Sequence, residues 1–381
     1  MPAGTVATDA CPGDGGQGFH RRAYTGERWL WSVDNVTKIP TTTIGSFPKP
    51  DYVSVRDWFQ RPYEPTFDAF YFDNRDLETR FALATKEVVT AQIDAGVDVP
   101  TDGEMRREHY IFYHLRHLSG VDFEHLHLRE IRTGAWEREV PTIVDRVRPK
   151  ERFLPYDYQV AQSYSSQPIK ITLPGPMTIA DTVADQHYGD PRRLNRDLAD
   201  TLNVEIRALA AAGCGHIQVD EPVFARKTEE ALAFGIEDLE RCFAGVPAEV
   251  QLVVHLCCGY PRHLDEPTEE VFKADPGAYF ELAEALDVAS VDAISLEHAH
   301  RPFDLRLLEL FEQSTVILGL IAIAKTPIEP MEEIRDRLDE ALSHIDRERL
   351  VAGPDCGLGM LDLATATSKL ANLTAAAKSI D

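Results

Sequence analysis

The segment VVHLCCGY, residues 253–260, ends an apolar run with an imidazole and a thiol two positions apart. Alternate residues of a β-strand face the same side, so His255 and Cys257 are expected to point toward one spot. Histidine nitrogen and cysteine sulfur are ligands that Zn²⁺ binds in tetrahedral sites. Two further apolar runs end on candidate ligands, Glu297 and, in the motif GPDCG, Cys356. The segment therefore predicts a strand that carries half of a metal site.

This strand belongs to a series in which apolar runs alternate with amphipathic helical patterns. Two early runs, at residues 39–44 and 96–104, flank a helical stripe at 76–95, and six further pairs follow from residue 169 onward. Eight such units predict an α/β fold, a closed (β/α)8 TIM barrel, with an open doubly wound sheet as the alternative. The six later strands are expected at 169–173, 216–219, 250–255, 293–296, 315–323 and 350–352, and their helices at 191–212, 228–243, 276–286, 303–311, 330–345 and 362–377.

The repeat is interrupted once, by a long polar stretch after the second strand. Residues 106–167 carry many aromatic and charged side chains without a clear period. An insertion of this length in a compact protein is typical of a lid, a binding excursion or a small subdomain. We expect residues 39–381 to form a single catalytic barrel that includes it. Residues 1–38 begin with a segment rich in Gly, Pro, Ala and Asp and are expected to be a partly disordered N-terminal arm.

Composition narrows the range of partners and locations. The 381 residues carry a net charge of −24, which argues against a nucleic acid or an anionic membrane surface as partner. No apolar run is long enough to suggest a membrane span. Six cysteines in a chain of this length do not resemble a disulfide framework. A reducing, cytoplasmic location fits this cysteine usage.

In a (β/α)8 barrel, catalytic groups lie where strands meet the loops that follow them. The candidate ligands come from three such strand ends, an arrangement that favours catalysis over a structural zinc site. Zinc at this rim has two plausible tasks, activation of water or binding of a substrate thiol. Two thiolate ligands lower the metal's Lewis acidity, which favours the thiol. Cys258 faces the other way and is expected to be a small buried residue.

Acidic residues at other strand ends suggest a ligand that carries an ammonium group. Glu104 and Asp220 are candidates for binding it, and the alternatives are paired carboxylates for acid-base chemistry, a second metal site, or helix capping. For Glu221 we expect a first-turn helical role, because Pro222 follows it. Backbone N–H groups near Gly45 are candidates for holding a carboxylate. A thiol with both groups is a thiol amino acid.

Several short motifs together resemble a known family, the catalytic domain of cobalamin-independent methionine synthases, over roughly residues 39–379. They are Ile44-Gly45-Ser46, Asp102-Gly103-Glu104, Asp220-Glu221-Pro222, His255-x-Cys257, Glu297 and Pro354-Asp355-Cys356-Gly357. The resemblance implies a (β/α)8 barrel in which zinc, bound by His255, Cys257, Glu297 and Cys356, activates homocysteine. It also implies that Ile44 and Ser46 contact homocysteine and that Glu104 and Asp220 hold its amino group.

The methyl-donor side of the site departs from the family pattern. The segment GLIAIAKTP, residues 319–327, lacks the Asp and His that classical members place after the seventh strand. Lys325 is a candidate substitute, and an ordinary surface lysine is an equally good interpretation. Residues 175–181 lack a Trp that would stack on a pterin. The chain also resembles the short, single-barrel type of the family, without a second folate-binding barrel.

The sequence thus predicts a zinc-dependent S-methyltransferase that acts on homocysteine or a similar thiol. Methyltetrahydrofolate, a methylated carrier protein or another small methyl compound is the expected donor, and a homo-oligomer or a donor protein is a candidate assembly. One alternative is a transferase of the epoxyalkane:coenzyme M type, with Arg106, Arg107 or Arg301 binding the sulfonate. A zinc hydrolase and a zinc-stabilised scaffold are the remaining alternatives.

Overall fold

The structure, a computed structural model, describes residues 38–53, 55, 75–267 and 274–380. Its centre is a sheet of six parallel strands in the order β3-β5-β6-β7-β8-β9. The expected N-terminal arm, residues 1–38, lies outside the described residues except for Lys38. The strands are β3 (Lys170–Pro174), β5 (His216–Asp220), β6 (Gln251–Leu256), β7 (Ala293–Leu296), β8 (Thr315–Ile321) and β9 (Leu350–Pro354).

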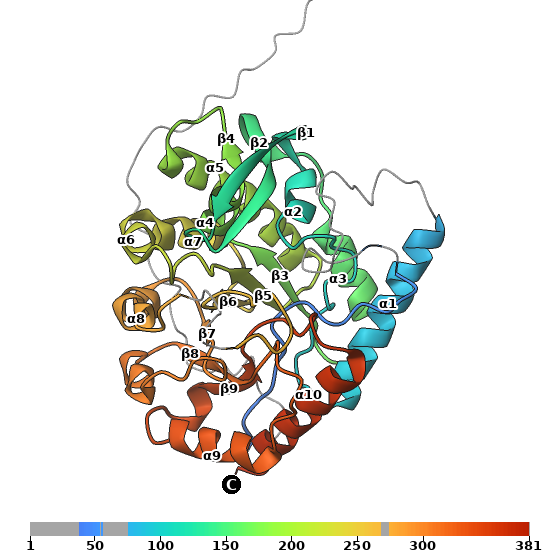
Figure 1. Cartoon of the computed structure of the whole chain (residues 1–381), viewed down its shortest axis with the longest axis vertical. Helices are drawn as coiled ribbons and strands as arrows, with labels where there is room; N and C mark the ends of the chain where they lie inside the picture. Colours follow the sequence, from blue (N-terminus) through green and yellow to red (C-terminus); the bar gives the residue numbers. More distant parts are fainter. Residues whose placement is uncertain (1–37, 54, 56–74, 268–273, 381) are drawn as a thin grey trace, which may run out of the picture.

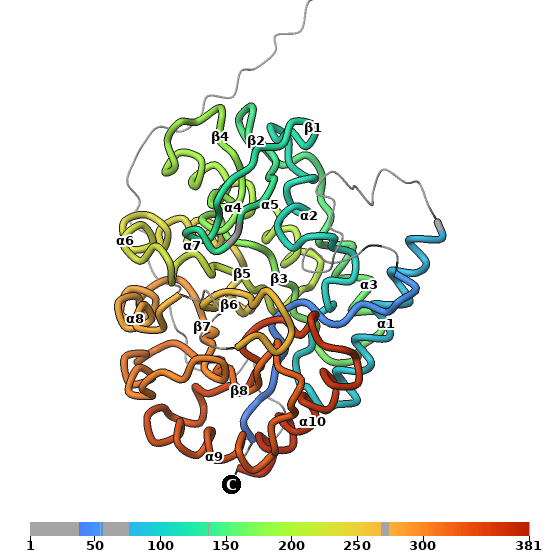
Figure 2. Tube along the Cα trace, viewed as in Figure 1, coloured from blue at the N-terminus to red at the C-terminus, as the bar shows by residue number. Residues whose placement is uncertain are grey.

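Two short segments close this sheet into a ring. Parallel bridges join Thr41 to Ala352 of β9, Thr42 to Val99, and Thr101 to Lys170 of β3. The two early apolar runs thus occupy the first and second of the eight strand positions, although they form single bridges instead of full strands. In Figure 2 the blue start of the described chain runs beside the red C-terminal units, as this closure requires. The closed (β/α)8 barrel is confirmed.

Helices surround the barrel on its outer face (Figure 1). Every barrel strand is buried, and its outward residues pack with the helices in one large apolar core. A smaller cluster, with one apolar residue from each of six strand positions, fills the barrel interior. The helices between and after the strands are α1 (Arg75–Asp94), α4 (Pro176–Thr182), α5 (Pro191–Ala211), α6 (Thr228–Glu230), α7 (Ile236–Phe243), α8 (Ala278–Val288), α9 (Met331–Ala341) and α10 (Leu363–Lys378).

Two predicted helices differ from the expectation. The segment expected as a helix at 303–311 forms only a 3-10 helix, η3 (Leu305–Leu310), which the Asp304 side chain caps. The helix expected at 228–243 contains a π-helical turn, η2 (Ala231–Gly235), between α6 and α7. Gly235 lies in that turn, and a Cβ there would come within 2.9 Å of the Phe224 ring. Close packing against the barrel therefore accompanies the irregular turn.

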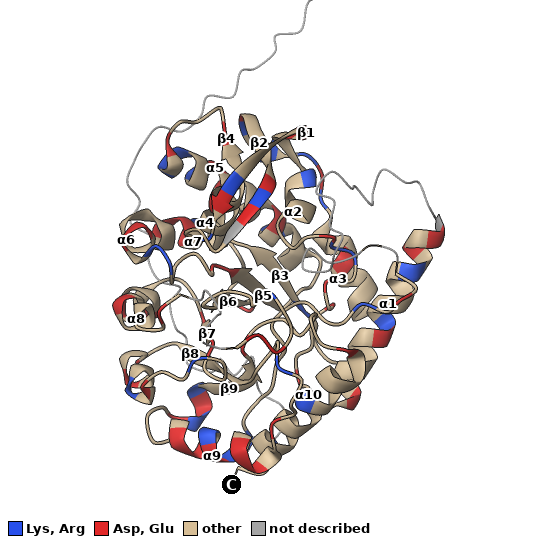
Figure 3. Ribbon diagram, in the orientation of Figure 1, with Lys and Arg blue, Asp and Glu red and all other residues tan. Residues whose placement is uncertain are grey.

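The polar stretch after the second strand position folds into an antiparallel hairpin between short helices. It contains α2 (Phe112–Arg116), β1 (Leu118–Ile131), β2 (Trp136–Pro149) and α3 (Leu154–Gln162), and a short strand, β4 (Ala184–Asp185), pairs with β2. The ribbon in Figure 3 marks Lys, Arg, Asp and Glu positions along both hairpin strands, as well as on outer helices such as α1 and α9. Among the described residues, no helix combines the length and apolar composition needed to span a bilayer.

Candidate active site

Three predicted metal ligands converge at the rim where the strands end. His255 is in β6, Cys257 follows that strand, and Cys356 follows β9. One possible ligand atom from each lies within 4.8 Å of the others. His255 and Cys257 are buried, and Cys356 is partly exposed toward the pocket described below. The barrel thus assembles a nitrogen and two sulfurs from two separate strand ends.

The surroundings of these three residues fit a soft divalent cation. His255 Nδ1 lies 2.9 Å from Ser295 Oγ, and its Nε2 is buried without a hydrogen-bond partner among the described residues. A ring held at one nitrogen with the other left for a metal is the usual state of a histidine ligand. The pKa of the Cys356 thiol is raised by its hydrogen bond with Cys257 and by burial. The donor set therefore fits zinc, whose charge would favour the thiolate form of both cysteines.

The fourth predicted ligand, Glu297, lies next to this cluster. Its carboxylate Oε2 accepts a hydrogen bond of 3.0 Å from the backbone N–H of Cys258, and the residue is almost fully buried. Cys258 is fully buried, as expected, and its Sγ donates to Tyr279 Oη at 3.3 Å. The described cysteines are all free thiols, which agrees with the expected absence of a disulfide framework.

Asp355, which sequence reasoning did not single out, fixes the loop that follows Glu297. Its carboxylate accepts hydrogen bonds from three consecutive backbone N–H groups, at 2.9 Å from His298, 2.8 Å from Ala299 and 2.6 Å from His300. Because Asp355 directly precedes Cys356, this clamp ties the end of β9 to the end of β7. The only signal available in sequence is its position in the GPDCG motif.

A pocket opens beside the cluster and contains all four predicted substrate-binding residues. Ile44, Ser46, Glu104 and Asp220 line it together with His255, Cys257 and Cys356. Gly357 also lines it, and a Cβ at that position would overlap Ser46 Oγ. The residues expected to bind an amino acid and three of the four expected to bind a metal therefore share one cavity, whereas Glu297 is not among its described lining residues.

Glu104 is held rigidly at the pocket wall. Its backbone is left-handed, with φ of 59°, a conformation that few non-glycine residues adopt and that surrounding contacts must support. Its carboxylate Oε1 accepts from Thr172 Oγ1 at 2.8 Å and from Arg107 Nη1 at 3.1 Å. Arg107 is fully buried and also donates to the Thr172 carbonyl at 2.8 Å. This network fixes a carboxylate at a defined place in the pocket.

Asp220 supplies the second carboxylate from the end of β5, in register with His255. Its Oδ1 accepts from Gln218 Nε2 at 2.7 Å, and the same amide donates to the Ile44 carbonyl at 2.8 Å. Burial raises the pKa of Asp220 to about 7. An ammonium group near Asp220 would lower that pKa again and stabilise the charged carboxylate.

The family model "Cobalamin-independent synthase, Catalytic domain" matches residues 39–379, which include every residue of this pocket. The chain belongs to the cobalamin-independent synthase family. A methionine synthase of Sulfolobus acidocaldarius is 31% identical over 343 residues, which cover 89% of this chain and 91% of that protein. A methionine synthase of Sulfurisphaera tokodaii is 30% identical, over 91% of this chain and 94% of that protein.

A solved structure supports the same assignment to the cobalamin-independent synthase family. It is described as a B12-independent methionine synthase from Shewanella sp. W3-18-1 in complex with selenomethionine. It superposes with a TM-score of 0.80 at 32% identity, over 89% of this chain and 97% of that one. A second structure, from Listeria monocytogenes, is 19% identical with a TM-score of 0.67 and shows the shared fold.

Glu221 differs from its expected role in this family member. No helix begins at Pro222, and the next helix, α6, starts at Thr228. The Glu221 carboxylate instead accepts from the backbone N–H groups of Met177 and Thr178, at 2.9 and 3.0 Å, and from Thr178 Oγ1 at 2.7 Å. It therefore stabilises the start of α4, a different helix from the one expected. Burial raises the pKa of Glu221 to about 8.

Four basic residues considered for the site do not line the pocket in the described part of the chain. Lys325 donates from Nζ to the Glu266 carbonyl, which gives it a structural contact at the loop after β8. Arg106 pairs with Glu78 and Asp157, and Arg301 donates to the Ala274 carbonyl at 2.6 Å. Arg107 donates a hydrogen bond to the Glu104 carboxylate, as described above.

Gly45 offers a test of the pocket geometry. A Cβ at this position would lie 2.8 Å from Glu104 Oε1, so Gly45→Ala should displace the carboxylate. We expect the variant to fold and to lose about 10-fold in affinity for homocysteine, the cost of roughly one misplaced charged hydrogen bond. Isothermal titration calorimetry measures this. Gly215→Ala is the matched control, because a Cβ there meets nothing within 4 Å. Equal affinities in both variants would contradict the predicted role of Glu104.

Proposed function

We propose that this chain is a zinc-dependent S-methyltransferase that converts homocysteine, or a similar amino-acid thiol, into its S-methyl product. The observation that carries the proposal is a single pocket that contains both a His-Cys-Cys cluster and two buried carboxylates. Soft ligands suit a metal that binds sulfur, and carboxylates suit an ammonium group. Membership in a family whose similar proteins are named methionine synthases supports the same activity.

The proposed metal ligands and the proposed substrate-binding residues have separate tasks. His255, Cys257 and Cys356 would hold zinc, with Glu297 as the fourth ligand. Bound there, zinc would lower the pKa of the substrate thiol. Glu104 and Asp220 bind the substrate ammonium group, and the backbone around Ile44 and Ser46 receives its carboxylate. Holding both ends of the amino acid directs its sulfur toward the cluster and toward the methyl donor.

The proposal also covers the organisation of the chain and the identity of the methyl donor. We propose that residues 39–381, including 106–167, act as one catalytic unit. Folate, a methylated carrier protein and another small methyl compound all remain donor candidates. Lys325 contacts the Glu266 carbonyl and does not line the pocket, so it has no proposed role in proton transfer to a departing donor.

The pocket favours an amino-acid thiol over coenzyme M. A sulfonate requires cationic partners, and none of Arg106, Arg107 and Arg301 lines the described pocket. The carboxylates of Glu104 and Asp220 would repel a sulfonate. A hydrolase is also disfavoured, because two cysteine ligands reduce the Lewis acidity that water activation needs.

An acceptor assay tests the proposed activity. Zinc-loaded protein is incubated with homocysteine or coenzyme M and with each of three donors, methyltetrahydrofolate, methylcobalamin and S-methylmethionine, and products are identified by mass spectrometry. We expect methionine from homocysteine with at least one donor, and no product from coenzyme M. Methylation of coenzyme M without methionine formation would overturn the proposal, and so would calorimetry that detects no homocysteine binding.

The pH dependence of methionine binding tests Asp220. Its raised pKa means that the metal-free protein carries a protonated, neutral Asp220 below about pH 7. An ammonium ligand binds the ionised carboxylate, so methionine affinity should rise between pH 6 and pH 8, with a midpoint near pH 7. Methionine lacks a titrating thiol, which keeps the profile simple. Asp220→Asn should bind weakly with a flat profile over this range. A wild-type profile that is equally flat would rule out Asp220 as the ammonium partner.

A further inference from the structure

Tyr110 is one of the residues that line the pocket beside the cysteine cluster. It precedes α2 in the excursion after the second strand position, and it lines the same pocket as Cys257 and Asp220. Its pKa is raised by burial, and the nearby negative groups of Cys257 and Asp220 add to that effect. A tyrosine hydroxyl is protonated at neutral pH, and this one belongs to a residue that shares a pocket with both Cys257 and Asp220.

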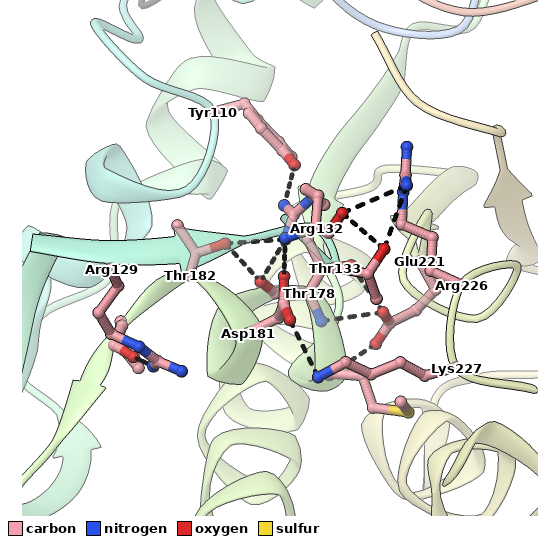
Figure 4. Close-up of polar contacts among 12 residues, drawn as sticks. Tyr110, Arg129, Arg132, Thr133, Thr178, Asp181, Thr182, Glu221, Arg226 and Lys227 are labelled. Atoms are coloured by element: carbon pink, nitrogen blue, oxygen red, sulfur yellow. Dashed lines mark hydrogen bonds and ion pairs between the residues drawn. The ribbon is translucent and has the colours of Figure 1, made fainter. Parts of the chain in front are cut away.

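Arg132 holds the Tyr110 hydroxyl in place (Figure 4). Its Nη2 donates to Tyr110 Oη at 2.7 Å. A guanidinium can only donate hydrogen bonds, so the tyrosine oxygen accepts and its own hydrogen must point away from Arg132. The other terminal nitrogen, Nη1, is fixed by Asp181 Oδ2 at 2.8 Å and Thr182 Oγ1 at 3.0 Å. The pair is thus anchored on α4, beside the barrel.

Arg132 comes from the tip of the β1–β2 hairpin, in an unusual backbone conformation. Arg132, Thr133 and Gly134 are all left-handed, with φ of 56°, 54° and 85°. Two consecutive non-glycine residues in this region need support from their surroundings. The backbone N–H of Arg132 donates to Asp181 Oδ2 at 2.9 Å, and Asp181 also pairs with Lys227 at 3.0 Å. These contacts turn the Arg132 side chain inward, so that it is only 8% exposed.

A second contact joins the hairpin tip to the metal-binding segment. Arg226 Nη1 donates to the Arg132 carbonyl at 3.2 Å, and its Nη2 donates to the Cys258 carbonyl at 3.1 Å. Gly259, which lines the pocket, leaves room for this guanidinium, because a Cβ there would lie 2.7 Å from Arg226 Nη2. The hairpin tip is therefore linked to the pocket in two ways. Arg132 contacts Tyr110 directly, and Arg226 connects the Arg132 carbonyl to the Cys258 carbonyl.

We propose that the β1–β2 excursion completes the thiol pocket, with Tyr110 as a residue that contacts the substrate beside its sulfur and Arg132 as the residue that positions it. This rests on the proposed function, because it names the amino-acid thiol as the ligand. The Tyr110 hydroxyl donates a hydrogen bond into the pocket, whose wall Tyr110 shares with Cys257 and Cys356. The excursion is in this sense part of the binding site.

A double-mutant cycle tests the pair. The affinities for homocysteine and methionine are measured by calorimetry on zinc-loaded wild type, Tyr110→Phe, Arg132→Met and the double variant. Tyr110→Phe should weaken binding about 3- to 10-fold, as expected for one hydrogen bond. If Arg132 acts through Tyr110, the double variant will be no weaker than Arg132→Met alone. Arg146→Met is the control, because this hairpin arginine pairs with Asp197 on the exposed side.

Alkylation provides a readout that does not depend on substrate. In metal-free protein, iodoacetamide labelling of Cys257 and Cys356 should be several-fold faster in Arg132→Met than in wild type, with labelling of buried Cys242 unchanged. If Arg132→Met does not fold, Arg132→Lys replaces it, since a single ammonium cannot bridge Tyr110 and Asp181 as the guanidinium does. Additive losses in the cycle, or a Tyr110→Phe variant with wild-type affinity, would overturn the inference. If wild type binds neither amino acid, the proposed function fails, and unchanged alkylation rates would then reject the positioning role of Arg132 separately.

Discussion

Replacing Cys356 with alanine is expected to remove bound zinc and abolish methyl transfer. The residue supplies one of the two sulfurs in a cluster of three ligands, so the variant would keep only His255, Cys257 and the proposed fourth ligand Glu297. Even changes outside the ligand shell cost 10- to 100-fold in metal affinity, so we expect a loss of more than about 100-fold. Metal content after dialysis, measured by mass spectrometry, should fall from about one zinc per chain to a trace.

Cys242→Ala is the matched control for this experiment. Cys242 is also a buried free thiol, but it lies in α7 on the outside of the barrel. Its loss should leave the zinc content unchanged. If Cys356→Ala retains wild-type zinc while the control behaves as expected, the ligand set proposed here is wrong.

The second large effect is expected at Glu104. In Glu104→Gln the amide oxygen can still accept from Thr172 and Arg107, so the variant should fold, but it cannot neutralise an ammonium group. Losing a charged hydrogen bond costs about 2 to 3 kcal/mol, which is roughly a 30- to 150-fold loss of homocysteine affinity. Calorimetry on the zinc-loaded protein gives this value directly.

Glu78→Gln is the matched control for Glu104→Gln, because Glu78 also forms an ion pair with an arginine. Glu78 pairs with Arg106, the residue next to Arg107, but its side chain is 45% exposed and outside the pocket. The control should bind homocysteine as wild type does. A Glu104→Gln variant that also binds normally would show that the ammonium group is held elsewhere.

Apolar strands were the most predictable part of this fold. The runs around the six barrel strands, β3 and β5 to β9, differ from their predicted bounds by at most two residues, because a strand buried on both faces is a nearly continuous apolar run. Strand ends were predictable because polar and reactive residues follow the apolar runs, although most of these residues are buried in the structure. His255, Cys257 and Cys356 come together because the parallel strands of a barrel end at one rim.

The excursion was not predictable, because its stability depends on distant contacts. Strands β1 and β2 carry many charged residues and are only partly buried, so they show no clear alternation. The hairpin is fixed by residues far away in the sequence, such as Asp181, which receives Arg132. The 3-10 helix at 305–310 was missed for a related reason, since six residues are too few for a helical period to distinguish the two forms.

The supporting residues of the site were missed for the same physical reason. Asp355, Arg107 and Tyr110 act through contacts with loops or side chains that are remote in sequence. Glu221 shows the converse, because the local Glu-Pro pattern suggested a helix start that the chain does not form there. Local sequence patterns identified the residues expected to carry out the chemistry. The residues that hold them in place could be identified only from the folded structure.

The central claim is that this pocket brings the sulfur of an amino-acid thiol to a metal held by His255, Cys257 and Cys356. Titrating homocysteine into the cobalt(II)-substituted protein tests it most directly, because each thiolate bound to cobalt adds near-ultraviolet charge-transfer absorption. We predict that this absorption increases to a one-to-one end point with homocysteine, and that homoserine, which lacks the sulfur, produces no such increase. A cobalt-loaded protein whose spectrum does not change with homocysteine would contradict the claim.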